Sequence, residues 1–328
     1  MKFATLKNDQ RDGELALVSR DLSQALDIHH IVPGLQLLLE NWESYSPALE
    51  QLYQQLNTRS IDSAFPFNSA AAMAPLPRSY QWLDGSAFLN HGHLIQQAFK
   101  LPPQDDERIP LMYQGASDTF IGANDPIQLP SEDHDIDFEG EFVVFLDDVP
   151  MACPADQALE HVRLISIVND VSLRSFIQRE IRSGFGFIQA KPSSSFAPVA
   201  VTPDELDGNW RDGRVCLPLS VTWNGTLFGH PDGGEMDFSF AELIAHAAYT
   251  RNLGAGTIIG SGTVSNKDSR RGSSCIAERR ALEMIETGSM TTAFMQFGDQ
   301  IRMEVFNADN ETVFGAIDQR VSQGVVYE

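Results

Sequence analysis

The segment Asp135–Leu146, DIDFEGEFVVFL, alternates in the way expected of a β-strand that enters the core of the molecule. Successive side chains of a strand point to opposite faces. One face is an ordinary core face and carries Phe138, Gly140, Phe142, Val144 and Leu146. The other face begins with carboxylates and becomes apolar, in the order Asp137, Glu139, Glu141, Val143 and Phe145. The segment therefore predicts a buried strand that carries two glutamates side by side.

Glu139 and Glu141 point the same way, so roughly 6–7 Å separates them in a strand. Two carboxylates this close repel each other, and burial raises their pKa values unless a cation lies between them. The segment alone leaves two interpretations open. The start of the strand is exposed and both glutamates face water, or the pair is half of a metal site that carboxylates from elsewhere in the chain complete.

The composition restricts the class of protein. The chain has 328 residues, 42% of them hydrophobic, and a formal net charge of −22. This acidity argues against nucleic acid and anionic membranes as partners. The chain has three widely separated cysteines, Cys153, Cys216 and Cys275. They form no C-x-x-C pair, so a thiolate zinc site is disfavoured. A sparse, odd number of cysteines is typical of a reducing compartment. No signal-peptide segment or membrane-spanning apolar run is apparent, so we expect a cytoplasmic protein.

The order of local patterns predicts two domains. Residues 1–60 combine short strands with a helical pattern, and residues 59–78 are rich in proline and small residues, as in a linker. From about residue 79 strand patterns dominate, including a hairpin with a type I′ turn at Asn224-Gly225. We therefore expect a small N-terminal α/β domain over residues 1–71 and a β-rich, α+β domain over residues 72–328.

Three polar residues have both a local and a functional interpretation. Asp170 ends the apolar run LISIVND and could cap the helix that follows. Asp84, in WLDGSAFLNHGH, could be a turn residue, and Lys191, in FIQAKPSSSFAP, could be a solvated loop lysine. Each becomes a candidate for a charged site only if the fold brings it close to Glu139 and Glu141.

The histidines and a helical glutamate are equally ambiguous. His91 and His93 lie two residues apart, a spacing that suits zinc in a strand, but no third nitrogen or sulfur ligand is evident. Glu278 begins a charged helical segment, where acidic residues are common because they interact favourably with the helix dipole.

Taken together, these segments resemble the fumarylacetoacetate hydrolase family. The resemblance covers about residues 72–322 and rests on five motifs in the order of the family: DIDFEGEFVVF, SIVNDVSLRSF, AKPSSSFAPVAVTPDEL, WNGTLFG and GTIIGSGTVS. It implies a mixed β-sandwich-like roll, usually assembled as a homodimer. It also implies a divalent cation held by acidic side chains, Mg²⁺ or Ca²⁺ with Mn²⁺ as an alternative, since hard oxygen ligands favour these ions over zinc.

The resemblance also assigns roles residue by residue. It implies metal ligands at Asp84, Glu139, Glu141 and Asp170. The implied catalytic residues are His91, with Glu278 beside it, and Lys191. The implied substrate contacts are Arg174, Thr263 and Gln178. Under this interpretation a cation separates Glu139 from Glu141.

Two positions depart from the pattern of the hydrolase that gives the family its name. A tyrosine of that enzyme is replaced by Ser86, and a glutamine by Ile177. Gln178 is one position away from the expected glutamine. These positions contact substrate in the family, so the departures bear on the identity of the substrate and not on the metal site.

The function that the resemblance implies is metal-dependent hydrolysis of a C–C bond in a β-diketo acid. The leading substrate is fumarylacetoacetate, cleaved to fumarate and acetoacetate at the end of tyrosine breakdown. The alternatives are hydrolysis of an acylpyruvate, decarboxylation of oxaloacetate, and a catalytically silent protein that binds a metal and a keto acid. The expected partners are a small-molecule substrate and a second copy of the chain, with neither nucleic acid nor membrane.

Overall fold

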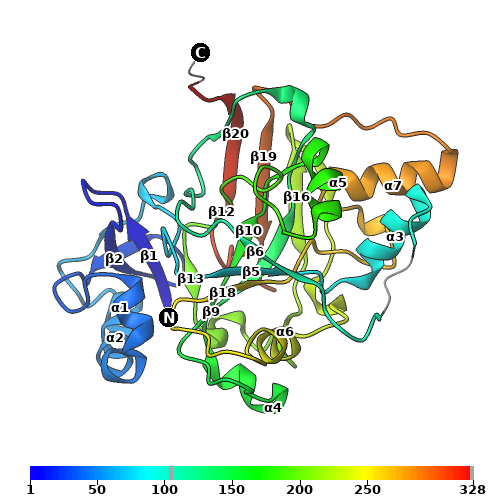
Figure 1. The fold of residues 1–328 in the computed structure, drawn as a ribbon. Coiled ribbons are helices and arrows are strands. Elements are labelled where there is room, and N and C mark those ends of the chain that lie inside the picture. Colours follow the sequence, from blue (N-terminus) through cyan, green and yellow to red (C-terminus); the bar gives the residue numbers. More distant parts are fainter. Residues whose placement is uncertain (103–105, 326–328) are drawn as a thin grey trace.

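The computed structural model describes residues 1–102 and 106–325, and its centre is an eleven-stranded mixed sheet (Figure 1). The strand order is β4-β3-β2-β1-β13-β10-β9-β18-β5-β6, with β12 paired to β10. The strands are β1 (Lys2–Leu6), β2 (Glu14–Val18), β3 (Gln24–Asp27), β4 (Phe65–Pro66), β5 (Trp82–Gly85), β6 (Met112–Gly115), β9 (Gly140–Leu146), β10 (Val162–Asn169), β12 (Ser195–Phe196), β13 (Ala200–Val201) and β18 (Ile258–Gly260).

A second sheet of five strands has the order β17-β16-β19-β20-β7. Its strands are β7 (Ile127–Leu129), β16 (Leu219–Trp223), β17 (Thr226–Gly229), β19 (Gln300–Val305) and β20 (Ile317–Gln323). Asn224 and Gly225 join β16 to β17 with φ angles of 50° and 76°, so the predicted type I′ hairpin is confirmed. Two small ladders pair β8 (Ile136–Asp137) with β11 (Ser172–Leu173), and β14 (Trp210–Arg211) with β15 (Arg214–Val215).

The helices gather in groups around these sheets. Figure 1 shows α3, α5 and α7 together on one side of the molecule, and α1 and α2 on the opposite side. The α-helices are α1 (Leu35–Glu40), α2 (Trp42–Asn57), α3 (Leu89–Phe99), α4 (Ala155–Ala158), α5 (Arg174–Ser183), α6 (Phe240–Ala247) and α7 (Ile276–Thr287). The 3₁₀ turns are η1 (Ser69–Ala71), η2 (Glu132–His134), η3 (Leu159–His161), η4 (Pro203–Leu206), η5 (Gly233–Glu235) and η6 (Ser269–Arg271). None of the helices in the described part of the chain is long and apolar enough to cross a membrane.

Strand β9 is buried on both faces, as the alternation of its sequence predicts. Phe142 and Val144 join one hydrophobic cluster, which also contains residues of β16 and β19. Val143 and Phe145 join a second cluster, which contains residues of β1 to β3, α1 and α2. Gly140 allows the sheets to approach, because a Cβ there would lie 2.8 Å from Leu219 Cδ2. The predicted fold class, β-rich and α+β, is confirmed.

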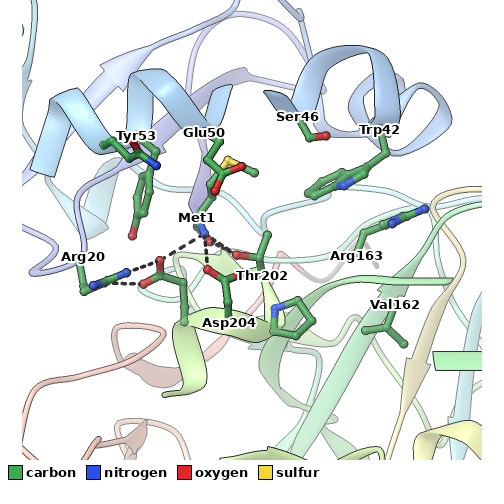
Figure 2. Close-up of a pocket in the computed structure, with 13 residues that line it drawn as sticks. Met1, Arg20, Trp42, Ser46, Glu50, Tyr53, Val162, Arg163, Thr202 and Asp204 are labelled. Atoms are coloured by element: carbon green, nitrogen blue, oxygen red, sulfur yellow. Dashed lines mark hydrogen bonds and ion pairs between the residues drawn. The ribbon is translucent and has the colours of Figure 1, made fainter. Parts of the chain in front are cut away.

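The first strands extend the central sheet, because β1 pairs with β13 at Lys2↔Val201 and Phe3↔Ala200. Beside this junction α2, β10 and η4 line a cavity of about 490 Å³. Arg20, labelled in Figure 2, lines this cavity. It donates two hydrogen bonds of 3.0 and 3.1 Å to the buried carboxylate of Glu205. The N-terminal segment is thus joined to the rest of the chain by a shared sheet and a half-buried ion pair. The predicted domain boundary at residue 71 stays a prediction.

Candidate active site

Four carboxylates converge where β5, β9 and β10 lie close together in the central sheet. One oxygen each from Asp84, Glu139, Glu141 and Asp170 lies within 4.8 Å of the other three. The sheet explains this convergence, since β18 pairs with both β5 and β9, and β9 pairs with β10. All four residues are at most 6% exposed. The exposed-strand interpretation of Glu139 and Glu141 is therefore wrong.

The two glutamates have opposite electrostatic surroundings. Burial alone would raise the pKa of Glu139, but the Lys191 ammonium and the Arg174 guanidinium beside it lower that pKa to about 2. Lys191 Nζ donates to Glu139 Oε2 at 2.8 Å and to Asp170 Oδ2 at 2.6 Å. The lysine is buried, so the solvated-loop interpretation of this residue is wrong. Glu139 is therefore ionised, and cations of the chain itself contact both Glu139 and Asp170.

The other half of the cluster lacks such partners. Burial raises the pKa of Glu141 well above its usual value, and the nearby charges of Asp84 and Asp170 add to the effect. Burial and the charge of Asp170 raise the pKa of Asp84 to about 8. Among the described residues, neither side-chain oxygen of Glu141 has a hydrogen-bond partner. Asp84 accepts one hydrogen bond, from the backbone N–H of Gly262 at 3.2 Å. A buried carboxylate without a partner is costly, so a cation beside Glu141 and Asp84 would stabilise the fold.

Gly260 leaves space at this point of the cluster. It lies on β18 between the two strands that carry Asp84 and Glu141. A Cβ at Gly260 would lie 2.4 Å from Asp84 Oδ1 and 3.0 Å from Glu141 Oε2. The four ligands offer only oxygen, so the residues fit a hard divalent cation such as Mg²⁺, Ca²⁺ or Mn²⁺.

His91 and Glu278 meet although 187 positions separate them in the sequence. His91 Nδ1 lies 2.8 Å from Glu278 Oε2, where α3 packs against α7. Glu278 is buried and His91 is mostly buried, and His91 lines the pocket above the carboxylates. His93 instead contacts Glu107, and its side chain is 50% exposed. The two histidines lie on different sides of one helix, so they do not form a shared zinc site.

Asp137 holds the start of α7 against the strand that carries the glutamates. Its fully buried carboxylate accepts hydrogen bonds from the backbone N–H of Ile276 at 2.7 Å and of Ala277 at 2.9 Å. It also accepts one of 2.8 Å from Arg174 Nε. Asp137 is visible on the polar face of the strand pattern, but its distant helix partners are not, so sequence reasoning gave it no role.

Arg174 is held by carboxylates of the chain. Besides the hydrogen bond to Asp137, its NH2 group donates to Glu139 Oε1 at 2.6 Å. The guanidinium also lines the pocket. Its predicted contact with substrate stays a prediction, but a large part of its charge is already neutralised by Asp137 and Glu139.

Asp170 does not cap α5. That helix begins at Arg174 with Leu173 at the N-cap position and no side-chain cap, so the predicted cap at Asp170 is wrong. The carboxylate instead accepts hydrogen bonds from Ser194 Oγ at 2.7 Å, from Lys191 and from the Tyr113 hydroxyl. Tyr113 lies on β6 in a segment without a recognisable motif, so sequence reasoning missed it.

A pocket of about 570 Å³ opens above the cluster. Its floor contains Asp84, Glu139 and Lys191, with His91 and Thr263 beside them. Ser86 and Ile177, the two positions that depart from the family pattern, line this pocket. Gln178 lines it as well. Much of its remaining lining is apolar and comes from α3, α5 and neighbouring segments: Ile95, Phe99, Leu101, Leu111, Ile177, Ile181, Phe187 and Phe294.

Comparison with known families agrees with this geometry. The family model described as "Fumarylacetoacetate (FAA) hydrolase C-terminal" matches residues 81–322. The chain belongs to the fumarylacetoacetate hydrolase family. A second model, "Fumarylacetoacetase N-terminal domain 2", matches residues 1–78. The family that the sequence motifs suggested is therefore confirmed.

Individual relatives of this chain have low sequence identity to it. A 2,4-didehydro-3-deoxy-L-rhamnonate hydrolase of Sphingomonas is 30% identical over 52% of this chain and 56% of its own length. A mitochondrial oxaloacetate tautomerase of Xenopus laevis is 24% identical over 52% of this chain and 51% of its own. The chain thus spans about half the length of these curated relatives.

Solved structures share the fold over almost the whole chain. Maleylpyruvate hydrolase from Sphingobium sp. SYK-6, in complex with Mn²⁺ and pyruvate, has a TM-score of 0.67 at 16% identity. The fumarylacetoacetate hydrolase of Exiguobacterium antarcticum has a TM-score of 0.65 at 17% identity. Both comparisons cover 99% of this chain and 100% of the other. At these identities the likeness establishes the fold.

Proposed function

We propose that the protein is a metal-dependent enzyme that hydrolyses a C–C bond in a β-diketo acid. The observation that carries the proposal is the His91–Glu278 pair, because His91 lines the same pocket as Asp84 and Glu139 of the four-carboxylate cluster. A protein that only binds a metal and a keto acid does not require a base oriented by a buried carboxylate. Family membership supports an enzymatic function, since named relatives include hydrolases and tautomerases.

The cluster would hold the divalent cation through Asp84, Glu139, Glu141 and Asp170. When bound, the cation would polarise a substrate carbonyl as a Lewis acid. Lys191 contacts two of the four carboxylates and stays protonated, because their charges raise its pKa despite burial. Its ammonium would therefore contribute positive charge beside the carbonyl oxygen as negative charge develops there.

His91 would act as the general base. A proton on Nδ1 donates to Glu278, which leaves Nε2 to accept a proton from water. The resulting hydroxide adds to the carbonyl carbon, and the adjacent C–C bond breaks. Its electron pair leaves with one fragment as an enolate, which takes a proton back as the second acid is released. Glu278 holds the imidazole in position and stabilises its charged form.

Fumarylacetoacetate and the acylpyruvates are our two candidate substrates. Ser86 and Ile177, which depart from the family pattern, line the pocket, so both substrate classes should be tested. Decarboxylation of oxaloacetate is less well supported, because it needs no base that activates water. We further propose, from the family resemblance, a homodimeric cytoplasmic protein that acts late in tyrosine breakdown and uses Mg²⁺, Ca²⁺ or Mn²⁺.

The test is a parallel assay of the purified protein with Mg²⁺ and with Mn²⁺ on fumarylacetoacetate, acylpyruvates and oxaloacetate. His91→Ala should lower the rate on the true substrate roughly 10²–10⁴-fold, the usual value of general base catalysis. His93→Ala is the matched control and should lower it little, because His93 contacts Glu107 and not the pocket floor. Inactivity of the wild type on every diketo acid would contradict the hydrolase proposal and favour a silent binder.

A further inference from the structure

Helix α3 carries His91 in its first turn but has no fully buried residue. Its N-cap residue, Phe88, forms no side-chain cap. The first backbone N–H groups of a helix need partners from outside the helix. Leu89 finds one in the carboxylate of Asp237, at 2.8 Å. The position of the first turn therefore depends on contacts with distant parts of the chain.

Asn90, directly before His91, makes two such contacts with its side chain. Its Nδ2 group donates to Ser265 Oγ at 2.8 Å and to the backbone carbonyl of Asn266 at 3.0 Å. An amide NH2 group has two donor hydrogens, so both are used. Ser265 and Asn266 are buried. Asn90 thus joins the exposed helix α3 to a buried loop 175 positions away in the sequence.

The loop that receives Asn90 follows β18 and is joined to the strand that carries the two glutamates. The Ser261 N–H donates to the Phe142 carbonyl at 2.9 Å, and the Val264 N–H donates to the Gly140 carbonyl at 3.1 Å. Both acceptors belong to β9 and lie on either side of Glu141. The start of the loop is therefore fixed to the strand that positions the predicted metal ligands.

The rest of the loop contacts the pocket and is held at its far end. The Gly262 N–H donates to Asp84 Oδ1 at 3.2 Å, and Thr263 lines the pocket. The side chain of Asn266 accepts a hydrogen bond from the Asp232 N–H at 2.8 Å and donates one to the Asp232 carbonyl at 2.9 Å. The groups that accept from α3 are therefore held in place independently of that helix.

A contact that fixes Asn90 also fixes the direction of His91, since neighbouring residues of an α-helix point about 100° apart. A rotation of about 10° around the helix axis moves an atom about 6 Å from that axis by about 1 Å. A displacement of that size at a catalytic group lowers a rate by as much as about 100-fold. The hydrogen bond to Glu278 holds one ring nitrogen, whereas Asn90 holds the turn from which the ring extends.

We propose that Asn90 is a positioning residue that holds His91 in a fixed place relative to the four carboxylates. It acts through Ser265 and Asn266 and contacts neither substrate nor cation. The inference rests on the proposed hydrolase function, in which His91 is the general base. It adds a physical route from the metal-binding strand β9, through the loop, to that base.

Kinetics of single and double variants test the proposal on the substrate that the parallel assay identifies. Asn90→Ala should lower kcat about 10–100-fold, while KM and the Mg²⁺ affinity measured by calorimetry each change less than about threefold. Ser265→Ala removes one of the two acceptors and should lower kcat less. The double variant should be no worse than Asn90→Ala alone, because both substitutions remove the same contact. Losses that multiply in the double variant would overturn the inference.

Gln97→Ala is the matched control. Gln97 is a second amide residue of α3, seven positions after Asn90 and thus on the same face of the helix, but it is exposed. Its loss should leave kcat unchanged. If Gln97→Ala lowered kcat as much as Asn90→Ala, the effect would come from weakening α3 as a whole. Asn90 would then have no special positioning role.

A structural measurement separates the positioning proposal from the hydrolase proposal, because it needs no turnover. In crystal structures of the wild type and Asn90→Ala, the imidazole of His91 should shift by about 1 Å relative to Asp84 and Glu139. An unmoved imidazole would overturn the inference even if kcat fell. A shifted imidazole in a protein that hydrolyses no diketo acid would support the positioning role and contradict only the hydrolase proposal.

Discussion

Glu141→Gln should stabilise the metal-free protein, and the gain should grow as the pH rises. Glu141 is fully buried, faces Asp84 and Asp170, and among the described residues has no hydrogen-bond partner for either oxygen. Its pKa is raised well above the usual value, chiefly by burial. The folded protein therefore keeps a proton that the unfolded chain releases above about pH 4–5. Each additional pH unit then favours the unfolded state, and glutamine at this position removes that effect.

The magnitude follows from proton linkage. One proton bound only in the folded state lowers the free energy of unfolding by about 1.4 kcal/mol for each pH unit. As long as folded Glu141 keeps its proton, the wild type should therefore lose up to about 1.4 kcal/mol for each pH unit relative to Glu141→Gln. A bound cation should make the wild type more stable than Glu141→Gln, because the cation binds the ionised carboxylates. Mg²⁺ at 100 times its Kd should stabilise the wild type by about 2.7 kcal/mol and the variant far less.

The assay is urea denaturation at pH 6, 7 and 8, with a chelator and with saturating Mg²⁺. Glu286→Gln is the control, because Glu286 is an exposed residue of α7 outside the cluster and its loss should leave the slope unchanged. Parallel stability curves for wild type and Glu141→Gln in chelator would refute the reasoning about the buried proton. Equal stabilisation of both proteins by Mg²⁺ would remove Glu141 from the ligand set.

Three further substitutions test the surroundings of the cluster. Lys191→Met leaves Glu139 and Asp170 without their shared cation, so the metal-free protein should lose about 3–5 kcal/mol in urea denaturation; Mg²⁺ should restore part of the stability but not kcat. Asp137→Asn should lower kcat about 10-fold or more while Mg²⁺ affinity by calorimetry stays within about threefold, because it loosens the start of α7 and not the ligands. Gly260→Ala should weaken Mg²⁺ binding at least about 10-fold, since its Cβ would lie 2.4 Å from Asp84 Oδ1, whereas a retained affinity would place the ion elsewhere.

The sequence predicted the central strand well because its pattern is local. Alternation over residues 140–146 is a property of neighbouring residues, and the two hydrophobic clusters divide these side chains as expected. The type I′ turn at Asn224-Gly225 is equally local, since it depends on two residues that tolerate positive φ. The contact between His91 and Glu278 spans 187 positions and could be expected only from the resemblance of whole motifs.

Local patterns alone could not place the residues whose pattern fits two environments, and only the family resemblance assigned Asp170 to the ligand set. An aspartate between a strand and a helix is a common N-cap. Asp170 instead accepts hydrogen bonds from Lys191, Ser194 and Tyr113, because it follows directly on the buried end of β10. Asp137 shows the converse, as it caps a helix that begins 139 positions later. Because Asp137 joins α7 to the glutamate-bearing strand, it couples the position of Glu278 to that of Glu139. A mechanism that needs a base and a cation at a fixed separation depends on such a residue, although Asp137 forms no hydrogen bond with His91 or with the residues of the pocket floor.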